Sequence, residues 1–134
     1  MNEKTLLLML LLACSSTRAS EWVSVGKSLS AEEFADVTSV QIDGDIRHVL
    51  SKSVFPPHRE KDPNDPNKWW AGKASQVAFN CKEGTSRRES MTIYYSDGNK
   101  FSIPDEYLPT SWRVVQPNTM LNEEILFICG WKAR

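Results

Sequence analysis

The feature that most constrains the fold is a change of hydrophobic period close to the C-terminus. From Trp22 to Val115, apolar residues mostly alternate with polar ones between short turns, which is the pattern of antiparallel strands. In the segment Met120–Cys129, apolar residues instead recur at helical spacing. A proline before this segment, two glutamates early in it and a glycine after it are signals of helix ends. The sequence therefore predicts a β-sheet followed by one helix, at Asn118–Cys129.

The predicted strands are short and are separated by turns that contain Gly, Asp or Pro. In chain order they are Trp22–Gly26, Ser39–Asp43, Ile46–Phe55, Trp69–Cys81, Arg87–Tyr95 and Lys100–Ile103, with a short extended piece at Trp112–Val115. We expect about five or six strands in a single antiparallel sheet, mostly a meander, with the C-terminal helix packed on it. This arrangement is an α+β fold.

Two segments are less regular. Ala31–Asp36 fits either one helical turn capped by Ser30 or a turn that leads into a strand, and we favour the turn and strand. Pro56–Lys68 holds four prolines and almost no apolar residue, so we expect it to be an exposed excursion from the sheet.

The N-terminal residues have the pattern of an export signal. Lys4 precedes an apolar run, Leu6–Ala13, that is too short to cross a bilayer but suits the hydrophobic region of a secretory signal. The run leads into Cys14, and the residues LLAC resemble the lipobox of bacterial lipoproteins, in which the signal is cleaved before an acylated cysteine. This resemblance predicts a signal peptide at residues 1–13, a lipidated flexible tether at 14–20 and one folded domain at 21–134. A chain of 134 residues has room for one such domain.

Alternatives to a lipid anchor at Cys14 remain open. Thr17–Ala19 offers a cleavage site for an ordinary signal peptidase, which would give a soluble secreted or periplasmic protein. The apolar run could also form a buried N-terminal helix. In the lipoproteins that the signal resembles, an Asp after the cysteine favours the inner membrane, so Ser15 favours the outer membrane. We therefore predict a cell-envelope protein held at the outer membrane by its lipid.

Cys81 and Cys129 are the two remaining cysteines, and export would place them in an oxidising compartment. A disulfide between them is favoured there over a metal site or a reactive thiol. Closing the loop between them would contribute about 4 kcal/mol of stability in the chain-entropy model. A catalytic thiol would need a base within reach, and the only histidines are His48 and His58.

Lys68, Trp69 and Trp70 are the first candidates for binding a partner. Adjacent strand residues point to opposite faces, so at least one of the two tryptophans can lie outside the core. Exposed Trp is common in the hot spots of protein interfaces. The structural alternative is that one Trp covers an end of the sheet while the other pairs across strands.

Arg87 and Arg88 are the second candidates, for an anionic partner. The structural alternative is a solvated strand edge, where charge deters aggregation. Alternation along Arg87–Tyr95 places Arg88 on the face opposite to Ile93.

The sequence favours no catalytic, cofactor-binding or metal-binding residues. It contains no common catalytic motif, no nucleophile with an evident base and no Cys/His cluster with zinc spacing. Its 16 basic and 17 acidic residues also lack the broad positive field that nucleic-acid binding requires. We therefore expect neither an enzyme nor a nucleic-acid-binding protein.

Several segments of the chain form a distinctive set. Phe34–Ser39 holds an aromatic-x-Asp-x-x-Ser motif, and the other segments are WVSV, VAFNCK, the pair of arginines before MTIYYSDG, and WRVVQPNT. Together these segments resemble the surface-adhesin protein E family of bacterial envelope proteins. The most specific element is the spacing of Cys81, Trp112, Pro117 and Cys129. The resemblance covers nearly all of residues 21–131, but Ala35 and the proline-rich loop depart from the family pattern.

The resemblance implies one antiparallel sheet with a C-terminal helix held by a disulfide. It also implies a non-catalytic envelope protein that binds a protein partner, from the host matrix or from the envelope itself. Because the proline-rich loop departs from the pattern, binding properties carried by loops are not transferred. A periplasmic assembly or inhibitor subunit and a small-ligand-binding domain are the alternatives. The oligomeric state stays open, a dimer included.

Overall fold

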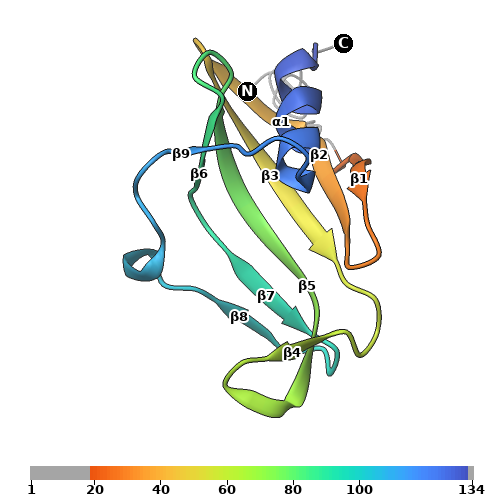
Figure 1. The fold of residues 1–134 in the computed structure, drawn as a ribbon. Helices are drawn as coiled ribbons and strands as arrows, with labels where there is room; N and C mark the ends of the chain where they lie inside the picture. The colour runs from red at the N-terminus through yellow and green to blue at the C-terminus, as the bar shows by residue number, and fades with distance from the viewer. Residues whose placement is uncertain (1–18, 133–134) are drawn as a thin grey trace, which may run out of the picture.

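The computed structural model describes residues 19–132, which form one β-sheet and one α-helix packed against it (Figure 1). Cys14, the signal peptide predicted at residues 1–13 and most of the predicted tether lie outside the described residues. No helix within residues 19–132 is long and apolar enough to cross a bilayer. The elements are β1 (Trp22–Lys27), β2 (Glu32–Asp43), β3 (Ile46–Val54), β4 (Glu60–Asp62), β5 (Asp65–Asn80), β6 (Thr85–Arg88), β7 (Thr92–Tyr95), β8 (Lys100–Ser102), the 3₁₀ helix η2 (Asp105–Tyr107), β9 (Arg113–Val114) and α1 (Met120–Gly130).

The strands of the described chain pair antiparallel in the order β1-β2-β3-β5-β6-β9. Three short strands lie off this path: β4 and β7 pair with β5, and β8 pairs with β7. They find room because β5, with 16 residues, is longer than any of its partners. The antiparallel sheet with the C-terminal helix packed on it confirms the predicted α+β fold.

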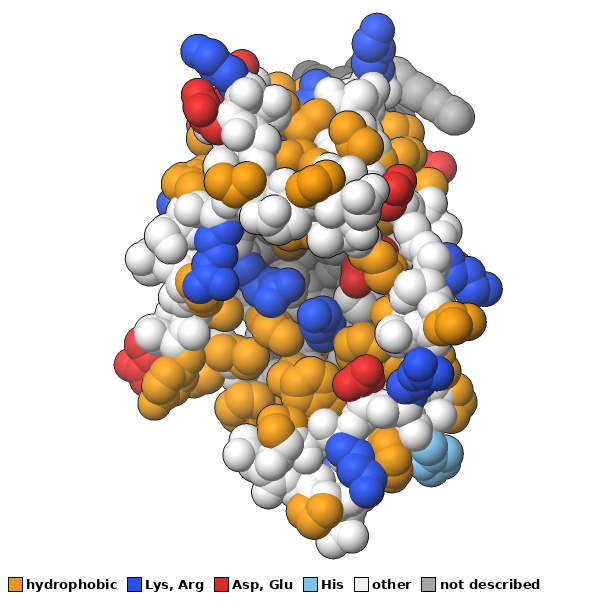
Figure 2. All heavy atoms as spheres, in the orientation of Figure 1, with side chains coloured by type: hydrophobic (Ala, Val, Ile, Leu, Met, Phe, Trp, Pro, Cys, Tyr) orange, Lys and Arg blue, Asp and Glu red, His pale blue; other side chains and the backbone are white. Residues whose placement is uncertain are grey.

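The hydrophobic core lies between α1 and the adjoining half of the sheet. Its buried side chains are Ala35, Val49, Val77, Phe79, Ile125 and Ile128. Burying a side chain such as Phe79, which has no exposed surface, contributes about 1.5–3 kcal/mol. The inner face of the sheet is open beyond the helix. Figure 2 shows a hollow there, with Lys and Arg side chains along its lower border.

The end of α1 is fastened to the sheet by two interactions. Cys129 forms a disulfide with Cys81, which directly follows β5, at a Cα–Cα distance of 5.7 Å. This bond confirms the predicted pairing. Arg47 of β3 donates hydrogen bonds of 2.5 Å to the carbonyl oxygens of Ile128 and Trp131. A positive charge at this position also interacts favourably with the negative end of the helix dipole.

The helix begins two residues later than predicted. Its first residue is Met120, because Asn118 has a φ of 60°, in the left-handed region rather than the helical one. Thr119 is the N-cap, and its hydroxyl accepts a hydrogen bond of 3.1 Å from the N–H of Asn122. The last helical residue is Gly130, one residue beyond the predicted end.

The turn before β2 settles the first irregular segment. The N–H of Ser28 donates a hydrogen bond of 2.8 Å to the carbonyl of Ala31, and β2 follows from Glu32. The turn-and-strand interpretation of Ala31–Asp36 is therefore confirmed, and the helical alternative is wrong.

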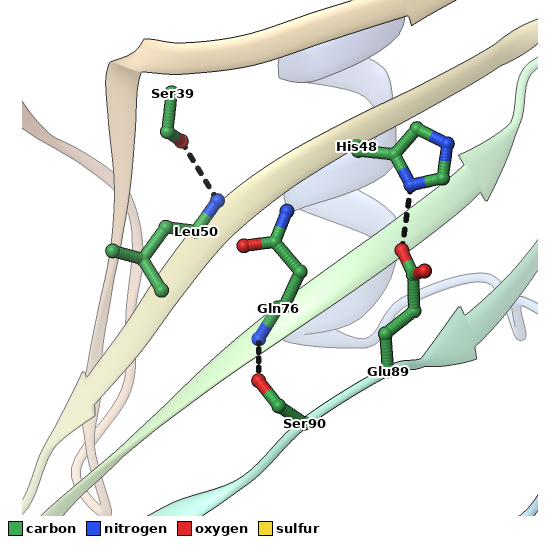
Figure 3. Close-up of polar contacts among 6 residues, drawn as sticks. All are labelled: Ser39, His48, Leu50, Gln76, Glu89 and Ser90. Atoms are coloured by element: carbon green, nitrogen blue, oxygen red, sulfur yellow. Dashed lines mark hydrogen bonds and ion pairs between the residues drawn. The ribbon is translucent and has the colours of Figure 1, made fainter.

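A bulge in β2 accounts for the Asp-x-x-Ser part of the family motif. After Asp36 the pairing with β3 is interrupted, and the Ser39 hydroxyl accepts a hydrogen bond of 2.8 Å from the N–H of Leu50 (Figure 3). The same hydroxyl donates to the Asp36 carbonyl at 2.7 Å. The buried Asp36 carboxylate accepts from the N–H of Glu21 and from the N–H and hydroxyl of Thr38. Burial raises the pKa of Asp36, but these hydrogen bonds outweigh it and lower the pKa below its usual value.

A second irregularity divides the strand predicted at Arg87–Tyr95 into β6 and β7. Opposite the dividing point, the Gln76 carbonyl accepts from the N–H of Glu89 at 2.7 Å. The Gln76 N–H donates to the Ser90 hydroxyl at 3.0 Å (Figure 3). The extra residues reverse the side-chain alternation. Arg88 therefore lies on the same face as Ile93, and the predicted opposite placement is wrong.

The proline-rich segment Pro56–Lys68 is mostly exposed, as predicted, but it is not simply a loop. It contains β4 and the first residues of β5, which pair as a hairpin. Two aspartates shape its turn: Asp62 accepts from the N–H of Asn64 at 2.7 Å, and Asp65 accepts from the N–H of Asn67 at 3.0 Å.

Candidate functional site

The inner face of the sheet changes from apolar to polar along β3 and β5. Near the helix, Val49 pairs with Val77 and both are buried. Two residues away on each of these antiparallel strands, Ser51 pairs with Ser75, and each serine is only 5% exposed. Small hydroxyls at positions that normally hold core residues leave space between the sheet and α1.

That space is a pocket of about 180 Å³, which we call the charged pocket. Its polar lining comes from five elements: β2, β3, β5, β6 and α1. The residues that matter for its chemistry are Glu33, Ser51, Lys73, Ser75, Arg88 and Glu124.

Glu124 is the most unusual residue of the charged pocket. Its side chain is only 3% exposed, and its Oε1 atom has no hydrogen-bond partner. Burial, reinforced by the negative charge of Glu33, raises the pKa of Glu124 to about 7, whereas a hydrogen bond from Ser51 and the charge of Arg88 oppose this rise. A buried carboxyl with an unsatisfied oxygen is costly in a folded protein.

The pocket holds positive groups as well. Burial and the nearby Arg88 lower the pKa of Lys73, while Glu33 and Glu60 counteract this. Glu33 accepts a hydrogen bond of 2.5 Å from the hydroxyl of Ser53. Oppositely charged groups therefore line one small pocket.

A second hollow adjoins the charged pocket, and we call it the arginine groove. It has a volume of about 320 Å³ and shares Val77, Arg88 and Leu121 with the charged pocket. Arg87 and Arg113 also line it, and none of its lining residues is acidic. The guanidinium of Arg87 lies 4.8 Å from the ring centroid of Trp112, a distance typical of cation–π contact.

The other predicted site, Lys68 with Trp69 and Trp70, lies on the hairpin of β4 and β5. All three side chains are half-buried. The Asp62 carboxylate accepts hydrogen bonds from the hydroxyl of Tyr95 at 2.8 Å and from the indole N–H of Trp70 at 3.3 Å. The hydrogen bond from Tyr95 is the main cause that lowers the pKa of Asp62.

The neighbouring side chains complete this cluster. The rings of His58 and Trp69 are nearly perpendicular, with their centroids 5.2 Å apart, and the ammonium of Lys61 lies 5.0 Å from the centroid of the same indole. The ammonium of Lys68 lies 4.9 Å from the ring centroid of Tyr95. These contacts favour the structural alternative, in which one Trp covers an end of the sheet and the other pairs across strands. Partner binding by these residues stays a prediction.

The structure does not bring the two predicted sites together. Trp70 pairs with Tyr95, whereas Arg88 pairs with Val77 further along β5. The separation from residue 70 to residue 77 is about 23 Å at about 3.3 Å per strand residue. Arg87 and Arg88, in contrast, both lie at the arginine groove.

The charged pocket was not predicted from the sequence, although two signals of it are present. Serines occupy inner positions of β3 (Ser51 and Ser53) and of β5 (Ser75), where a buried face would normally be apolar. Glu124 lies one helical turn before Ile128 and thus on the core-facing side of α1. Either signal indicates a polar group where the core should be.

Within residues 19–132 there is one ion pair, between His48 and Glu89 at 2.6 Å on the outer face of the sheet (Figure 3). Both side chains are partly exposed. Among residues 19–132 no group of three or more His, Cys, Asp or Glu side chains is arranged to hold a metal ion.

Comparisons with known proteins identify one family and solved structures of similar fold. The family model for surface-adhesin protein E matches residues 22–130. A structure of the selenomethionine form of Haemophilus influenzae protein E has a TM-score of 0.59 and 15% identity, and the match covers 84% of this chain and 88% of that chain. A crystal structure of protein E from non-typeable Haemophilus influenzae has a TM-score of 0.53 and 16% identity, with 88% and 81% covered. The two TM-scores, both above 0.5, establish a shared fold, and identities this low show nothing beyond the fold. No curated protein matches the sequence.

Proposed function

The chain belongs to the surface-adhesin protein E family, and on this basis we propose that it is a non-catalytic lipoprotein of the bacterial cell envelope whose domain binds a protein partner. The family is one of surface adhesins, which gives the coarse function and an envelope location. The lipid anchor, the outer-membrane location and the binding surface are the parts that we add.

The anchor in this proposal is Cys14, acylated after removal of residues 1–13. Acyl chains contribute about 0.8 kcal/mol per buried CH₂, so several chains hold a protein firmly at a membrane. Residues 14–21 can span at most about 28 Å. The domain would therefore stay close to the membrane surface while remaining free to turn towards a partner.

Mass spectrometry of the mature N-terminus tests the anchor. We expect a chain that starts at Cys14 and carries acyl mass, and a C14S variant that is released from the membrane fraction. A mature chain that starts after Ala19 without acyl mass would show that the protein is secreted in soluble form. Protease treatment of intact cells tests its orientation, because complete protection would indicate a periplasm-facing subunit instead.

The arginine groove is the observation that supports partner binding most directly. Three arginines lie around an apolar floor that includes Val77 and Leu121, and no acidic residue lines it. Guanidinium groups bind carboxylates with two parallel hydrogen bonds, and Arg is enriched in protein interfaces. The groove therefore fits an acidic segment of a partner that also carries an apolar side chain.

The binding test uses the full-length protein in outer-membrane vesicles, presented to immobilised host matrix proteins and to envelope proteins. The groove variant R87E/R113E reverses two charges at the proposed surface. The control variant K27E/K100E makes the same change in net charge at two exposed lysines outside the groove. We expect salt-sensitive binding that only the groove variant loses. Equal binding by both variants would place the contact elsewhere, and no binding to any protein would contradict the function.

A further inference from the structure

We propose that the charged pocket binds a small zwitterion, a free α-amino acid, with its ammonium group at Glu124 and Glu33 and its carboxylate at Lys73 and Arg88. This inference is independent of the protein-binding function proposed above. It rests on the polar lining of the pocket, the separation of its charges and its size.

The lining of the charged pocket does not serve the core. Ser51, Ser53 and Ser75 are each 4–5% exposed, on two adjacent strands, and each is too small to fill the gap below α1. Burying polar groups is unfavourable unless they are hydrogen-bonded, and apolar side chains at the same positions would extend the core. The Ser53 hydroxyl donates to Glu33, so these small side chains keep the pocket open and polar instead of filling it.

Glu124 provides the negative end of the site. Its Oε1 atom is buried and has no partner, so it is an acceptor without a donor. Glu33, from the neighbouring strand β2, lines the same pocket. An ammonium group carries three donors and would satisfy the free oxygen.

Lys73 and Arg88 provide the positive groups of the site. They lie on adjacent strands, β5 and β6, and line the pocket that the two carboxyls line. Within residues 19–132 the one ion pair joins His48 to Glu89, so neither cation comes within 4 Å of either carboxyl oxygen. The opposite charges that line the pocket are therefore not paired directly with one another. A molecule with both charges can bridge the gap, whereas a simple anion or cation would satisfy only one side.

The size of the pocket limits the ligand. Its volume of about 180 Å³ equals about six water molecules at ~30 Å³ each, which is room for a molecule of about that many non-hydrogen atoms. An α-amino acid with a small side chain has this size. A longer side chain could extend past Val77 and Leu121 into the arginine groove, where both residues also contribute to the lining.

Calorimetric titration of the full-length protein in detergent micelles tests the proposal with three probes. L-alanine carries both charged groups, ethylamine carries only the ammonium, and propionate carries only the carboxylate. We expect L-alanine to bind most tightly. Propionate or ethylamine binding as tightly as L-alanine would overturn the two-ended site, and so would a failure of L-alanine to bind the folded protein.

Variants assign the two ends of the site. Glu124→Gln keeps the shape but not the charge, and Lys73→Met removes the ammonium, so each should weaken L-alanine binding at least about tenfold. The matched controls are Glu106→Gln and Lys82→Met, at exposed residues that do not line the pocket. Circular dichroism confirms that each variant is folded. Unchanged affinity in a folded E124Q protein would refute the role of Glu124.

The dependence on pH gives a second readout. Glu124 on α1 is faced by Glu33 on β2, Ser51 and Lys52 on β3, Lys73 on β5 and Arg88 on β6. An arriving ammonium favours the charged form of Glu124, so binding below about pH 7 should release a proton. Titrations in two buffers of different ionisation enthalpy measure that proton. Binding without proton release at pH 6 in wild type, or equal release in E124Q, would place the ammonium elsewhere.

Discussion

The buried carboxyl of Glu124 should make the stability of the protein depend on pH in a way that one substitution removes. In the folded protein its pKa is raised to about 7, against 4.5 for an exposed glutamate. Replacing Glu124 by Gln keeps the size and the hydrogen-bonding side chain but removes the titrating group. The difference in the free energy of unfolding between the two proteins therefore isolates the effect of this carboxyl.

The sign and size follow from proton linkage. Between pH 4.5 and 7 the folded state binds the Glu124 proton more tightly than the unfolded state, so stability falls as the pH rises. The stabilising contribution is complete below about pH 4.5 and is lost as the pH passes through about 7. At about 1.36 kcal/mol per pKa unit, the raised pKa corresponds to about 3 kcal/mol. As the pH rises from 4.5 to 8, the free energy of unfolding of E124Q should increase by this amount relative to that of the wild-type protein.

The assay is urea unfolding of both proteins from pH 4.5 to 8, with the disulfide intact and without added ligand. Taking the difference between the proteins cancels the contribution of other carboxyls, such as Asp36. Glu123→Gln is the control, because Glu123 precedes Glu124 on α1 but is exposed. The reasoning is refuted if the difference between E124Q and wild type stays constant over this pH range.

Three further substitutions test what holds the fold together. The double variant Cys81→Ser/Cys129→Ser opens a loop of 48 residues and should lower the free energy of unfolding by about 4 kcal/mol, as measured by denaturant unfolding. Reduction of the wild-type disulfide should have the same effect. A much smaller loss of stability in both experiments would contradict the chain-entropy estimate. Ser39→Ala leaves a backbone N–H of β3 without its acceptor and should lower the free energy of unfolding by about 1–3 kcal/mol, with faster amide hydrogen exchange confined to the bulge. Unchanged exchange rates at the bulge would indicate that this N–H has another acceptor. Arg47→Met removes both hydrogen bonds to the end of α1 and should lower the free energy of unfolding by about 1–3 kcal/mol, with a lower melting temperature. Arg59→Met, at an exposed site, is the control and should change the melting temperature little. Equal effects of the two substitutions would show that the helix end does not depend on this contact.

Much of the fold was accessible from the sequence because its signals are local. Alternation and turn residues indicated the strands on both sides of Gly44, and the helical period indicated α1. Cys81 and Cys129 were predicted to pair because an exported chain folds in an oxidising compartment, and the structure joins them in a disulfide. Errors arose where a strand meets a partner of different length. The division of Arg87–Tyr95 into two strands depends on which part of β5 pairs with β6 and which part pairs with β7. No local sequence pattern specifies this.

The candidate site shows even more clearly that local sequence patterns do not reveal contacts between distant segments. Arg87 and Arg88 were noticed because two adjacent charges stand out in a sequence, and the structure places both at the arginine groove. Glu124 and Lys73 did not stand out, because a single charged residue in a helix or strand normally faces water. Only the packing of α1 against the sheet buries that glutamate.

The sequence by itself determined the period of each segment, the positions of the turns, the cysteines available for pairing and the candidate signal before Cys14. These properties depend on neighbours a few residues apart. The tertiary structure decided which strands share an edge, where β2 and β6 depart from regular pairing, and which polar residues meet below α1. Those outcomes depend on groups from five elements coming within contact distance. The electrostatic character of the charged pocket exists only once the chain has folded.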